Sequence, residues 1–334
     1  MDIGGKEFIF SEFGVSGREE RVKAVIEEFA GTLVDEIVYD ITGSLICIKK
    51  GQGKNRKKVM LTAHMDTIGF VVTYIDEKGF LRFAEVGEQP EAYLLGKRVI
   101  FENGTLGVIG IEKREHEKKL STEKMFIDIG AANREEALKR VGIGEMCAVY
   151  SPVVATEHIL TGGWMDDRIG CYVLLAVMER LKQHPHDILF VFSAQEEVGL
   201  RGAQTSSYRF EPDVGLSVDA TGSSDLPEGE LISSCALGKG AGIKIMDRSV
   251  IVPKKIVHYL IELAEKHHIS WQRDIMNTGR TGAQAIQLSR GGVLAGGISV
   301  PVRYLHSAGE MCSAADVQAC IELVSAFCQD KILL

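Results

Sequence analysis

Helical and strand-like stretches alternate through the second half of the chain, and this alternation limits the possible folds more than any other feature. Helices are predicted at residues 169–181, 201–208, 253–267, 283–288 and 314–328. Strands are predicted between them at residues 187–193, 214–218, 269–275 and 293–298. Strands joined through helices run parallel, because a parallel pair needs a long crossover connection. We therefore predict an α/β fold with a mostly parallel sheet flanked by helices on both faces.

One helix and two strands are predicted before this pattern. The sequence Ser-Gly-Arg-Glu at residues 16–19 is a capping box, and apolar residues from Val22 to Ala30 follow at helical spacing. The apolar run at residues 58–63 predicts a buried strand that stops at His64. We expect the first 66 residues to add strands to the sheet of the second half.

The segment between these parts has a different character. Short β-like pieces separated by turn signals fill it, and a helix is predicted only at residues 134–140. This pattern predicts an inserted β-rich domain. The expected boundaries are residues 1–66 and 162–334 for a discontinuous α/β domain, and residues 67–161 for the insertion.

The charge balance argues against a nucleic-acid partner. The 334 residues include 38 Lys+Arg and 46 Asp+Glu, for a net charge of −8, and the basic residues form no dense stripe. Affinity for a phosphate backbone depends on clustered positive charge. The hydrophobic fraction of 45% is that of an ordinary globular protein, so we expect a sizeable core and no nucleic-acid binding.

Neither export nor membrane insertion is predicted. The first residues lack the basic start and apolar middle of a signal peptide, and no run approaches the roughly 18 apolar residues of a membrane span. The seven cysteines are scattered and include no C-x-x-C pair. We therefore expect reduced core thiols in a cytoplasmic protein without a membrane partner.

Histidines and acidic residues stand at predicted strand ends and helix starts. Three of them, His64, Glu196 and Asp219, directly follow apolar runs. Ligand sites of open α/β sheets collect at the carboxyl ends of the strands. Each residue alone has a plainer interpretation, as a hydrogen-bonded edge histidine or a solvated acidic turn. Their shared placement predicts one site formed by His64, Asp66, Asp166, Asp167, Glu196, Glu197, Asp219 and His306.

This combination of side chains suits divalent metal ions. Histidines and carboxylates without cysteine are ligands for Zn²⁺, Co²⁺ or Mn²⁺. Two histidines and three or four carboxylates match two metals that share a bridging carboxylate. Asp66 is placed to accept the second imidazole N–H of His64. Of the adjacent Glu196 and Glu197, one could bind metal while the other acts as general base.

Six stretches of the chain, in order and spacing, are similar to a known family. They are AHMDTIG at 63–69, MDDRIG at 165–170, SAQEEVGLRGA at 193–203, VD at 218–219, LGKG at 237–240 and ISVPVRYLHS at 298–307. The sequence resembles the cocatalytic metallo-aminopeptidases of the glutamyl/leucyl type, which assemble into tetrahedral dodecamers (TET). The resemblance spans nearly the whole chain.

The resemblance implies a role for each site residue. Asp166 would bridge two divalent ions, Zn²⁺ or Co²⁺ with Mn²⁺ as a further option. The resemblance gives one ion His64 and Asp219, and the other ion Glu197 and His306. Glu196 would be the general base, and Asp66 the partner of His64.

The resemblance also implies an activity and an assembly. The reaction would be hydrolysis of N-terminal residues from short peptides, with metal-activated water attacking the peptide carbonyl. The inserted segment would be a PDZ-like small domain that helps subunits associate into a dimer-based homo-oligomer, a dodecamer in the family. One departure is Gly282, where family members often carry an aspartate.

Three other functions are consistent with parts of the pattern. Related dinuclear deacylases and carboxypeptidases use the same order of ligands, but their extra domain precedes the last histidine, whereas here it separates Asp66 from Asp166. A glycosidase could use two carboxylates but would not need the histidines. A non-catalytic peptide-binding protein would not need an intact ligand set.

The substrate side chain is left open by the sequence. Two interpretations apply to three basic residues, which either favour an acidic substrate side chain or are solvated charges: Lys244, Arg248 and Arg280.

Overall fold

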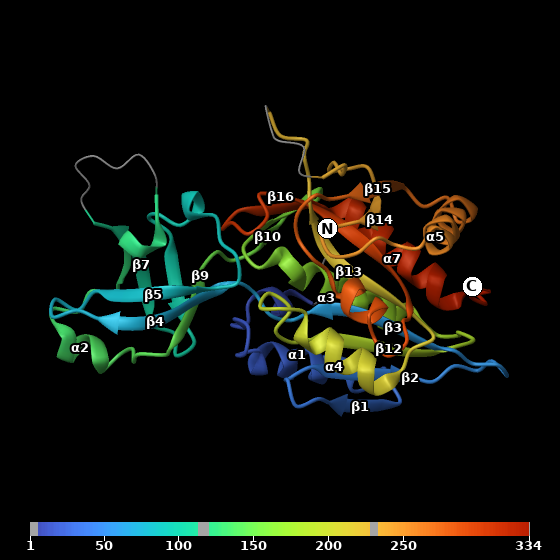
Figure 1. Cartoon of the computed structure of the whole chain (residues 1–334), viewed down its shortest axis with the longest axis horizontal. Helices are drawn as coiled ribbons and strands as arrows, with labels where there is room; N and C mark the ends of the chain where they lie inside the picture. The colour runs from blue at the N-terminus through green and yellow to red at the C-terminus, as the bar shows by residue number, and fades with distance from the viewer. Residues whose placement is uncertain (1–5, 113–119, 228–232, 334) are drawn as a thin grey trace.

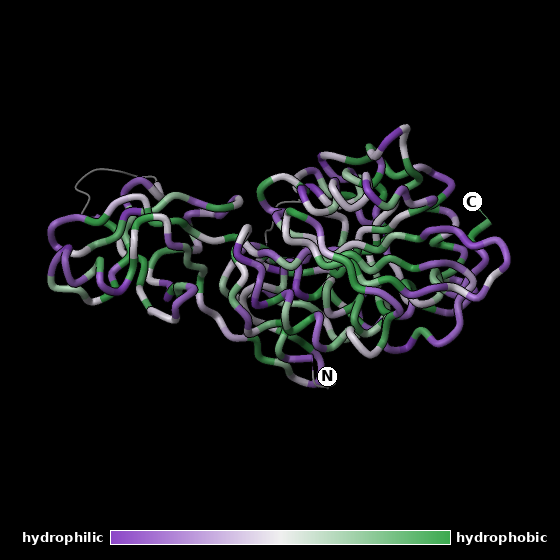
Figure 2. The backbone as a smooth tube through the Cα atoms, turned by 90° about the horizontal axis from the view of Figure 1, so that it is seen from below, coloured by the Kyte–Doolittle hydropathy of each residue, from purple (hydrophilic) through white to green (hydrophobic). Residues whose placement is uncertain are grey.

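The computed structural model describes residues 6–112, 120–227 and 233–333, which form two bodies (Figure 1). The larger body is a sheet with helices on both faces, and the smaller body is a β-barrel to one side of it. Apolar segments gather in the central strands of the larger body (Figure 2). The α/β class predicted from the sequence is confirmed.

Eleven strands form the large sheet. Their bounds are Glu36–Tyr39 (β1), Leu45–Lys49 (β2), Lys58–His64 (β3), Val154–Ala155 (β10), Ile159–Gly162 (β11), Asp187–Ser193 (β12), Val214–Gly222 (β13), Ala241–Met246 (β14), Trp271–Ile275 (β15), Leu294–Arg303 (β16) and Glu310–Ser313 (β17). Nine of them follow the order β1-β2-β12-β3-β13-β16-β17-β11-β10, and β14, paired with β15, also pairs with β16. Strand β10 and all but the last residue of β11 lie within the predicted 67–161 insertion, yet both strands belong to this sheet.

The large sheet is mixed rather than mostly parallel. Strands run parallel from β12 through β3 and β13 to β16, and β14 runs parallel to β15. The pairs β1–β2, β2–β12, β14–β16, β16–β17, β17–β11 and β11–β10 are antiparallel. The prediction of a mostly parallel sheet is therefore correct for the centre and wrong for the margins. There, short turns such as residues 40–44 and 304–309 join neighbouring strands without a crossover helix.

The helices cover both faces of the sheet. Their bounds are Glu20–Ala30 (α1), Met165–Arg180 (α3), Arg201–Phe210 (α4), Lys254–Lys266 (α5), Gly282–Gln287 (α6) and Ala314–Gln329 (α7). Helices α1, α3, α5 and α7 pack on one face, and α4 and α6 on the other. Neighbouring residues of β12 point into different apolar clusters: Phe190 belongs to the main buried cluster of the larger body, and Leu189 to a smaller, separate one. Burial on both faces explains why this strand is continuously apolar.

Several local features differ from the sequence prediction. The first 66 residues hold three strands, β1, β2 and β3, where two were predicted. Helix α1 begins at Glu20, and Ser16 does not cap it because its Oγ donates to Asp66 Oδ2 at 2.6 Å. The capping-box interpretation is therefore wrong, although the helix itself is present. Strands β14 and β17 were not predicted, because β14 begins in a glycine-rich stretch and β17 has four residues.

Six short strands close into the barrel. Their bounds are Gly69–Ile75 (β4), Leu81–Val86 (β5), Arg98–Phe101 (β6), Leu106–Ile111 (β7), Met125–Asp128 (β8) and Met146–Val149 (β9). Helix α2 at Arg134–Leu138 and the 3₁₀ turns Glu91–Tyr93 (η2) and Thr122–Lys124 (η3) also belong to the inserted segment, whereas the 3₁₀ turn Glu7–Phe10 (η1) packs on α1 and α3 of the larger body. The strand order around the barrel is β4-β5-β8-β7-β6-β9. Phe70, Phe101 and Ile127 lie in its own apolar core.

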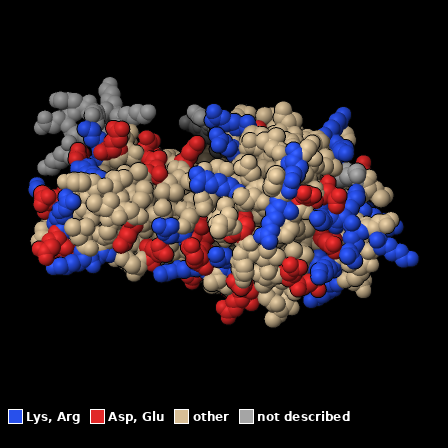
Figure 3. All heavy atoms as spheres, turned by 60° about the horizontal axis from the view of Figure 1, so that its bottom comes forward, with Lys and Arg blue, Asp and Glu red and all other residues tan. Residues whose placement is uncertain are grey.

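The cysteines, the surface charges and the helix lengths also bear on the sequence predictions. All seven cysteines are buried and free of disulfides, as predicted. Acidic and basic side chains are intermixed on the face shown in Figure 3. No helix in the described part of the chain is both long and apolar enough to cross a membrane.

A buried ion pair joins strands β14 and β15 of the large sheet. Lys244 Nζ lies 2.6 Å from Asp274 Oδ2, and neither side chain is exposed. Lys244 is therefore not a solvated charge. Because Lys244→Met leaves a buried carboxylate without its counter-charge, we expect the free energy of unfolding to fall by about 3–5 kcal/mol. Urea unfolding would measure this. The double variant Lys244→Met/Asp274→Leu should recover most of the loss, and an unchanged midpoint in the single variant would contradict the prediction.

Candidate active site

The predicted site residues converge where the central strands end. His64 is the last residue of β3, and Asp219 lies in the neighbouring parallel strand β13. Asp166 stands at the start of α3. Asp66 follows β3, Glu196 and Glu197 lie in the loop after β12, and His306 lies in the loop after β16. The residues brought together are His64, Asp66, Asp166, Glu196, Glu197, Asp219 and His306.

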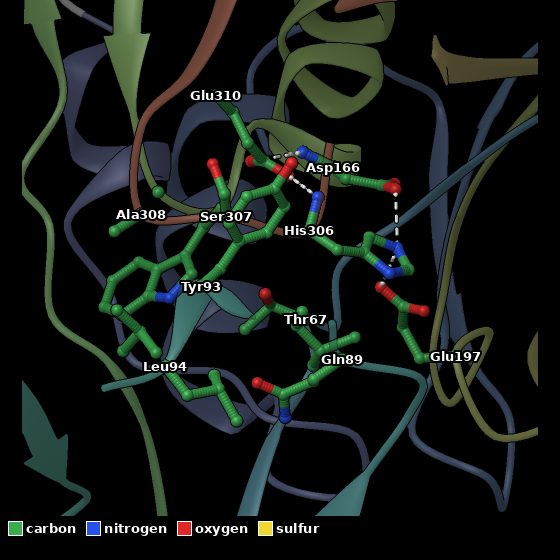
Figure 4. A pocket seen from close by; sticks show the side chains of 14 residues that line it. Thr67, Gln89, Tyr93, Leu94, Asp166, Glu197, His306, Ser307, Ala308 and Glu310 are labelled. Atoms are coloured by element: carbon green, nitrogen blue, oxygen red, sulfur yellow. Dashed lines mark hydrogen bonds and ion pairs between the residues drawn. The ribbon is translucent and has the colours of Figure 1, made fainter. Parts of the chain in front are cut away.

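Asp166 lies between two imidazoles. His64 Nε2 is 3.0 Å from Asp166 Oδ1, and His306 Nε2 is 3.2 Å from Asp166 Oδ2. Figure 4 shows His306 between Asp166 and Glu197. The two oxygens of one carboxylate therefore face two different histidines.

Further carboxylates surround each imidazole. Asp219 Oδ1 lies 3.8 Å from His64 Nε2, and Glu197 Oε1 lies 3.8 Å from His306 Nε2. Glu196 Oε2 also approaches His64 Nε2, at 3.9 Å. One ligand atom from each of His64, Asp166 and Glu197 lies within 4.8 Å of the others. The arrangement can therefore surround a metal ion.

Asp167 is a further carboxylate beside His64. One ligand atom from each of His64, Asp167 and Asp219 also lies within 4.8 Å of the others. However, both Asp167 oxygens already accept backbone hydrogen bonds, Oδ2 from His64 N at 3.1 Å and Oδ1 from Gly170 N at 2.9 Å. Asp167 thus joins the end of β3 to the first turn of α3.

Burial shapes the electrostatics of the site. It raises the pKa of Glu197 to about 8 and that of Asp219 to about 7, and the Asp166 carboxylate adds to both shifts. Burial also raises the pKa of Glu196 well above its ordinary value. For Asp166 the two imidazoles outweigh burial and lower the pKa. For His306 the carboxylates of Glu197 and Asp166 outweigh burial and raise the pKa to about 10.

These residues fit divalent cations. Glu197 Oε1 is buried and accepts no hydrogen bond from the residues described. Crowded buried carboxylates raise one another's pKa, and a cation between them would relieve that repulsion. Imidazole and carboxylate are also the ligands that Zn²⁺, Co²⁺ and Mn²⁺ accept. The cluster therefore has the donors, the burial and the excess negative charge of a metal site.

Asp66 holds the loop that carries the two glutamates. Its Oδ1 accepts the backbone N–H of Glu196 at 2.9 Å, and its Oδ2 accepts that of Glu197 at 3.1 Å. His64 Nδ1 lies 3.6 Å from Asp66 Oδ1 but 3.1 Å from the Asp66 carbonyl oxygen. The Asp66 carboxylate therefore contacts the glutamate loop more closely than the imidazole it was predicted to orient.

Two buried glutamates that were not predicted as site residues also hold the site in place through backbone hydrogen bonds. Glu310 Oε1 accepts the backbone N–H of His306 at 2.8 Å, and its Oε2 accepts that of Asp166 at 3.3 Å. Glu19 Oε1 accepts the backbone N–H of Gln195 at 3.0 Å. The position of Glu310 four residues after His306 is the one local hint, since a carboxylate that binds backbone groups has no sequence pattern of its own.

A pocket opens beside Asp166, Glu197 and His306. Apolar and aromatic side chains also line it: Ile68, Tyr93, Leu94, Val149 and Trp164. Figure 4 shows Tyr93 and Leu94 on the side away from Glu197. Tyr93 ends η2 and Leu94 follows it, so the insertion forms part of the pocket wall.

The fold and the site define an α/β enzyme with a buried His/carboxylate cluster, fit for divalent cations, beside a pocket. The comparison with family models agrees with this class. The chain belongs to the M42 glutamyl aminopeptidase family, whose model matches residues 43–323. It is therefore a peptidase, a hydrolase of peptide bonds.

Relatives match over almost the full chain. A putative aminopeptidase of Acetivibrio thermocellus is 43% identical over 317 residues, which are 94% of this chain and 95% of that protein. The structure of an aminopeptidase from Desulfurococcus kamchatkensis has a TM-score of 0.93 at 36% identity, covering 98% of this chain and 94% of that one. The TET1 peptidase of Pyrococcus horikoshii, which can assemble into a tetrahedron or a large octahedral shell, has a TM-score of 0.88 at 28% identity, covering 98% and 100%.

Proposed function

We propose that this protein is a two-metal aminopeptidase that removes N-terminal residues from short peptides. His64, Asp219 and Asp166 would hold one divalent cation, and His306, Glu197 and Asp166 the other. The observation that carries the proposal is the position of Asp166, whose Oδ1 and Oδ2 lie 3.0 Å and 3.2 Å from two different imidazoles. A shared carboxylate of this kind suits a pair of Zn²⁺ or Co²⁺ ions, and Mn²⁺ is a further option.

Glu196 is proposed as the general base. When bound, the cations would polarise the substrate carbonyl and lower the pKa of water at the site. Glu196 belongs to neither ligand set, and its raised pKa suits it to take a proton from the attacking water and pass it to the leaving amine. Asp66 acts as a positioning residue by accepting the backbone N–H of Glu196.

The proposal extends to assembly. We propose that the barrel corresponds to the PDZ-like domain implied by the family resemblance and that subunits associate through it into a dimer-based dodecamer. The closed shells of the Pyrococcus horikoshii relative support this idea. Light scattering on the purified protein measures the assembled mass.

Metal removal gives the direct test of the activity. A chelator should abolish hydrolysis of unblocked aminoacyl-p-nitroanilides, because the ligand set would lose the ions that activate the carbonyl and the water. Added Zn²⁺ or Co²⁺ should restore the rate. The measurement is the initial rate with each metal at defined free concentration.

An N-acetylated form of the same substrate is the matched control. An aminopeptidase should not release p-nitroaniline from it, whereas equal rates on both forms would contradict the proposal. Full activity in the metal-free protein would contradict the metal-dependent mechanism itself.

A further inference from the structure

The two proposed cation sites depend on different parts of the fold. His64 Nδ1 lies 3.1 Å from the carbonyl oxygen of Asp66, two residues further along the chain. His306 Nδ1 instead lies 2.7 Å from the carbonyl oxygen of Glu88, which follows barrel strand β5. A neutral imidazole carries one N–H, so an Nδ1–H that donates to a carbonyl leaves the Nε2 lone pair for a cation. The barrel therefore supplies the acceptor that orients His306.

The same loop of the barrel also passes close to Glu197. We define the barrel loop as residues 86–90. Within it, Gly87 has φ +79°, and a Cβ at this position would lie 2.6 Å from Ile68 Cγ2 and 3.4 Å from Glu197 Cβ. The loop has no room for a side chain here, and its backbone conformation favours glycine. It thus confines Glu197 as well as orienting His306.

A third contact fixes the position of the barrel loop. The Gln89 side chain is buried, and its Nε2 donates to the carbonyl oxygen of Gly69, the first residue of β4. Figure 4 shows Gln89 in the pocket wall near Glu197. Across the residues the structure describes, no hydrogen bond joins the barrel loop to His64 or Asp219.

We infer that the barrel loop positions the ligands of one cation site and not of the other. It orients His306 and confines Glu197, whereas His64 and Asp219 are held within the large sheet. The placement of the barrel thereby sets the affinity for one cation and leaves the affinity for the other unchanged. This inference rests on the proposed two-metal function.

Gly87→Ala tests the inference, because the added methyl group would lie too close to Ile68 Cγ2 and would strain the left-handed backbone, so the barrel loop would have to shift. Calorimetric titration of the metal-free protein with Zn²⁺ should show two binding steps in the wild type. In the variant, we expect one step to be unchanged and the other to weaken by about 10-fold to 100-fold. At limiting Zn²⁺ the activity of the variant should fall, and excess Zn²⁺ should restore it, which a folding defect would not allow.

Gly96→Ala is the matched control. Gly96 lies in the same insertion with φ +76°, and a Cβ there would meet nothing within 4 Å. The control carries similar backbone strain without contact at the site, so both binding steps should be unchanged. If Gly87→Ala does not fold, Gln89→Ala removes the hydrogen bond to Gly69 without adding bulk and should weaken the same step.

The outcomes separate the inference from the proposed function. Two unchanged steps in both loop variants, or equal weakening of both steps, would overturn the role of the barrel loop and leave the two-metal function standing. Fewer than two bound ions in the wild type would instead overturn the two-metal function, and the inference with it. Selective weakening of one step supports both.

Discussion

The variant Glu196→Gln is expected to lower kcat by about 10²-fold to 10⁴-fold while both cations stay bound. Glutamine keeps the shape of glutamate but cannot take a proton from the attacking water. Glu196 Oε2 lies 3.9 Å from His64 Nε2, close enough that a ligand role has to be tested directly. The measurements are kcat on an unblocked aminoacyl-p-nitroanilide and the metal content of the same preparation.

Glu197→Gln is the matched control, because it makes the same change one residue away. Glu197 is 3.8 Å from His306 Nε2 and belongs to a proposed ligand set, so this variant should lose one cation. If Glu196→Gln lost metal and Glu197→Gln kept both ions, the two roles would be exchanged. A kcat near the wild-type value in Glu196→Gln would exclude Glu196 as the general base.

The variant Asp166→Asn is expected to remove both cations and, with them, all measurable activity. Among the described residues, Asp166 is the one side chain within ion-pair distance of both His64 and His306, and asparagine replaces its shared carboxylate with a neutral amide. A ligand present at 100 times its Kd stabilises the folded state by about 2.7 kcal/mol, so the variant should also lose stabilisation by added Zn²⁺. Metal content and thermal unfolding with and without Zn²⁺ measure these effects.

Asp219→Asn is the control for this prediction. Asp219 approaches His64 but not the other imidazole within ion-pair distance, so its variant should lose one cation and keep the second. Two tightly bound ions in Asp166→Asn would refute the bridging role. Identical metal loss in the two variants would show that the cluster binds its ions as one unit rather than as two sites.

Local periodicity predicted much of the fold. The five helices of the second half are present, as is the strand that ends at His64, because apolar spacing reports directly which side of a segment is buried. The antiparallel margins were not predicted, since pairing such as β16 with β17 depends on a turn whose geometry the sequence pattern does not reveal. The strands β14 and β17 were missed because β14 begins in a glycine-rich stretch and β17 has only four residues.

The residues of the candidate site were predicted more completely than the residues that hold them in place. Residues that follow apolar runs meet at one edge when the runs become neighbouring parallel strands, so His64, Glu196 and Asp219 could be grouped from position alone. Ser16 and Glu310 could not be grouped with them. Each acts on partners that only the fold brings near it, the Asp66 carboxylate for Ser16 and the backbone N–H groups of His306 and Asp166 for Glu310.

The sequence by itself determined which acidic and imidazole groups the chain carries, and which strands and helices deliver them to one edge of a sheet. Those properties follow from side-chain chemistry and local apolar spacing. The tertiary structure alone decided that the carbonyl of Glu88, in the barrel, faces His306, and that the N–H of Asp166 faces Glu310. Backbone carbonyls are alike in every residue, as are nearly all backbone N–H groups, so no sequence pattern marks the few that orient a site, and only folding brings them there.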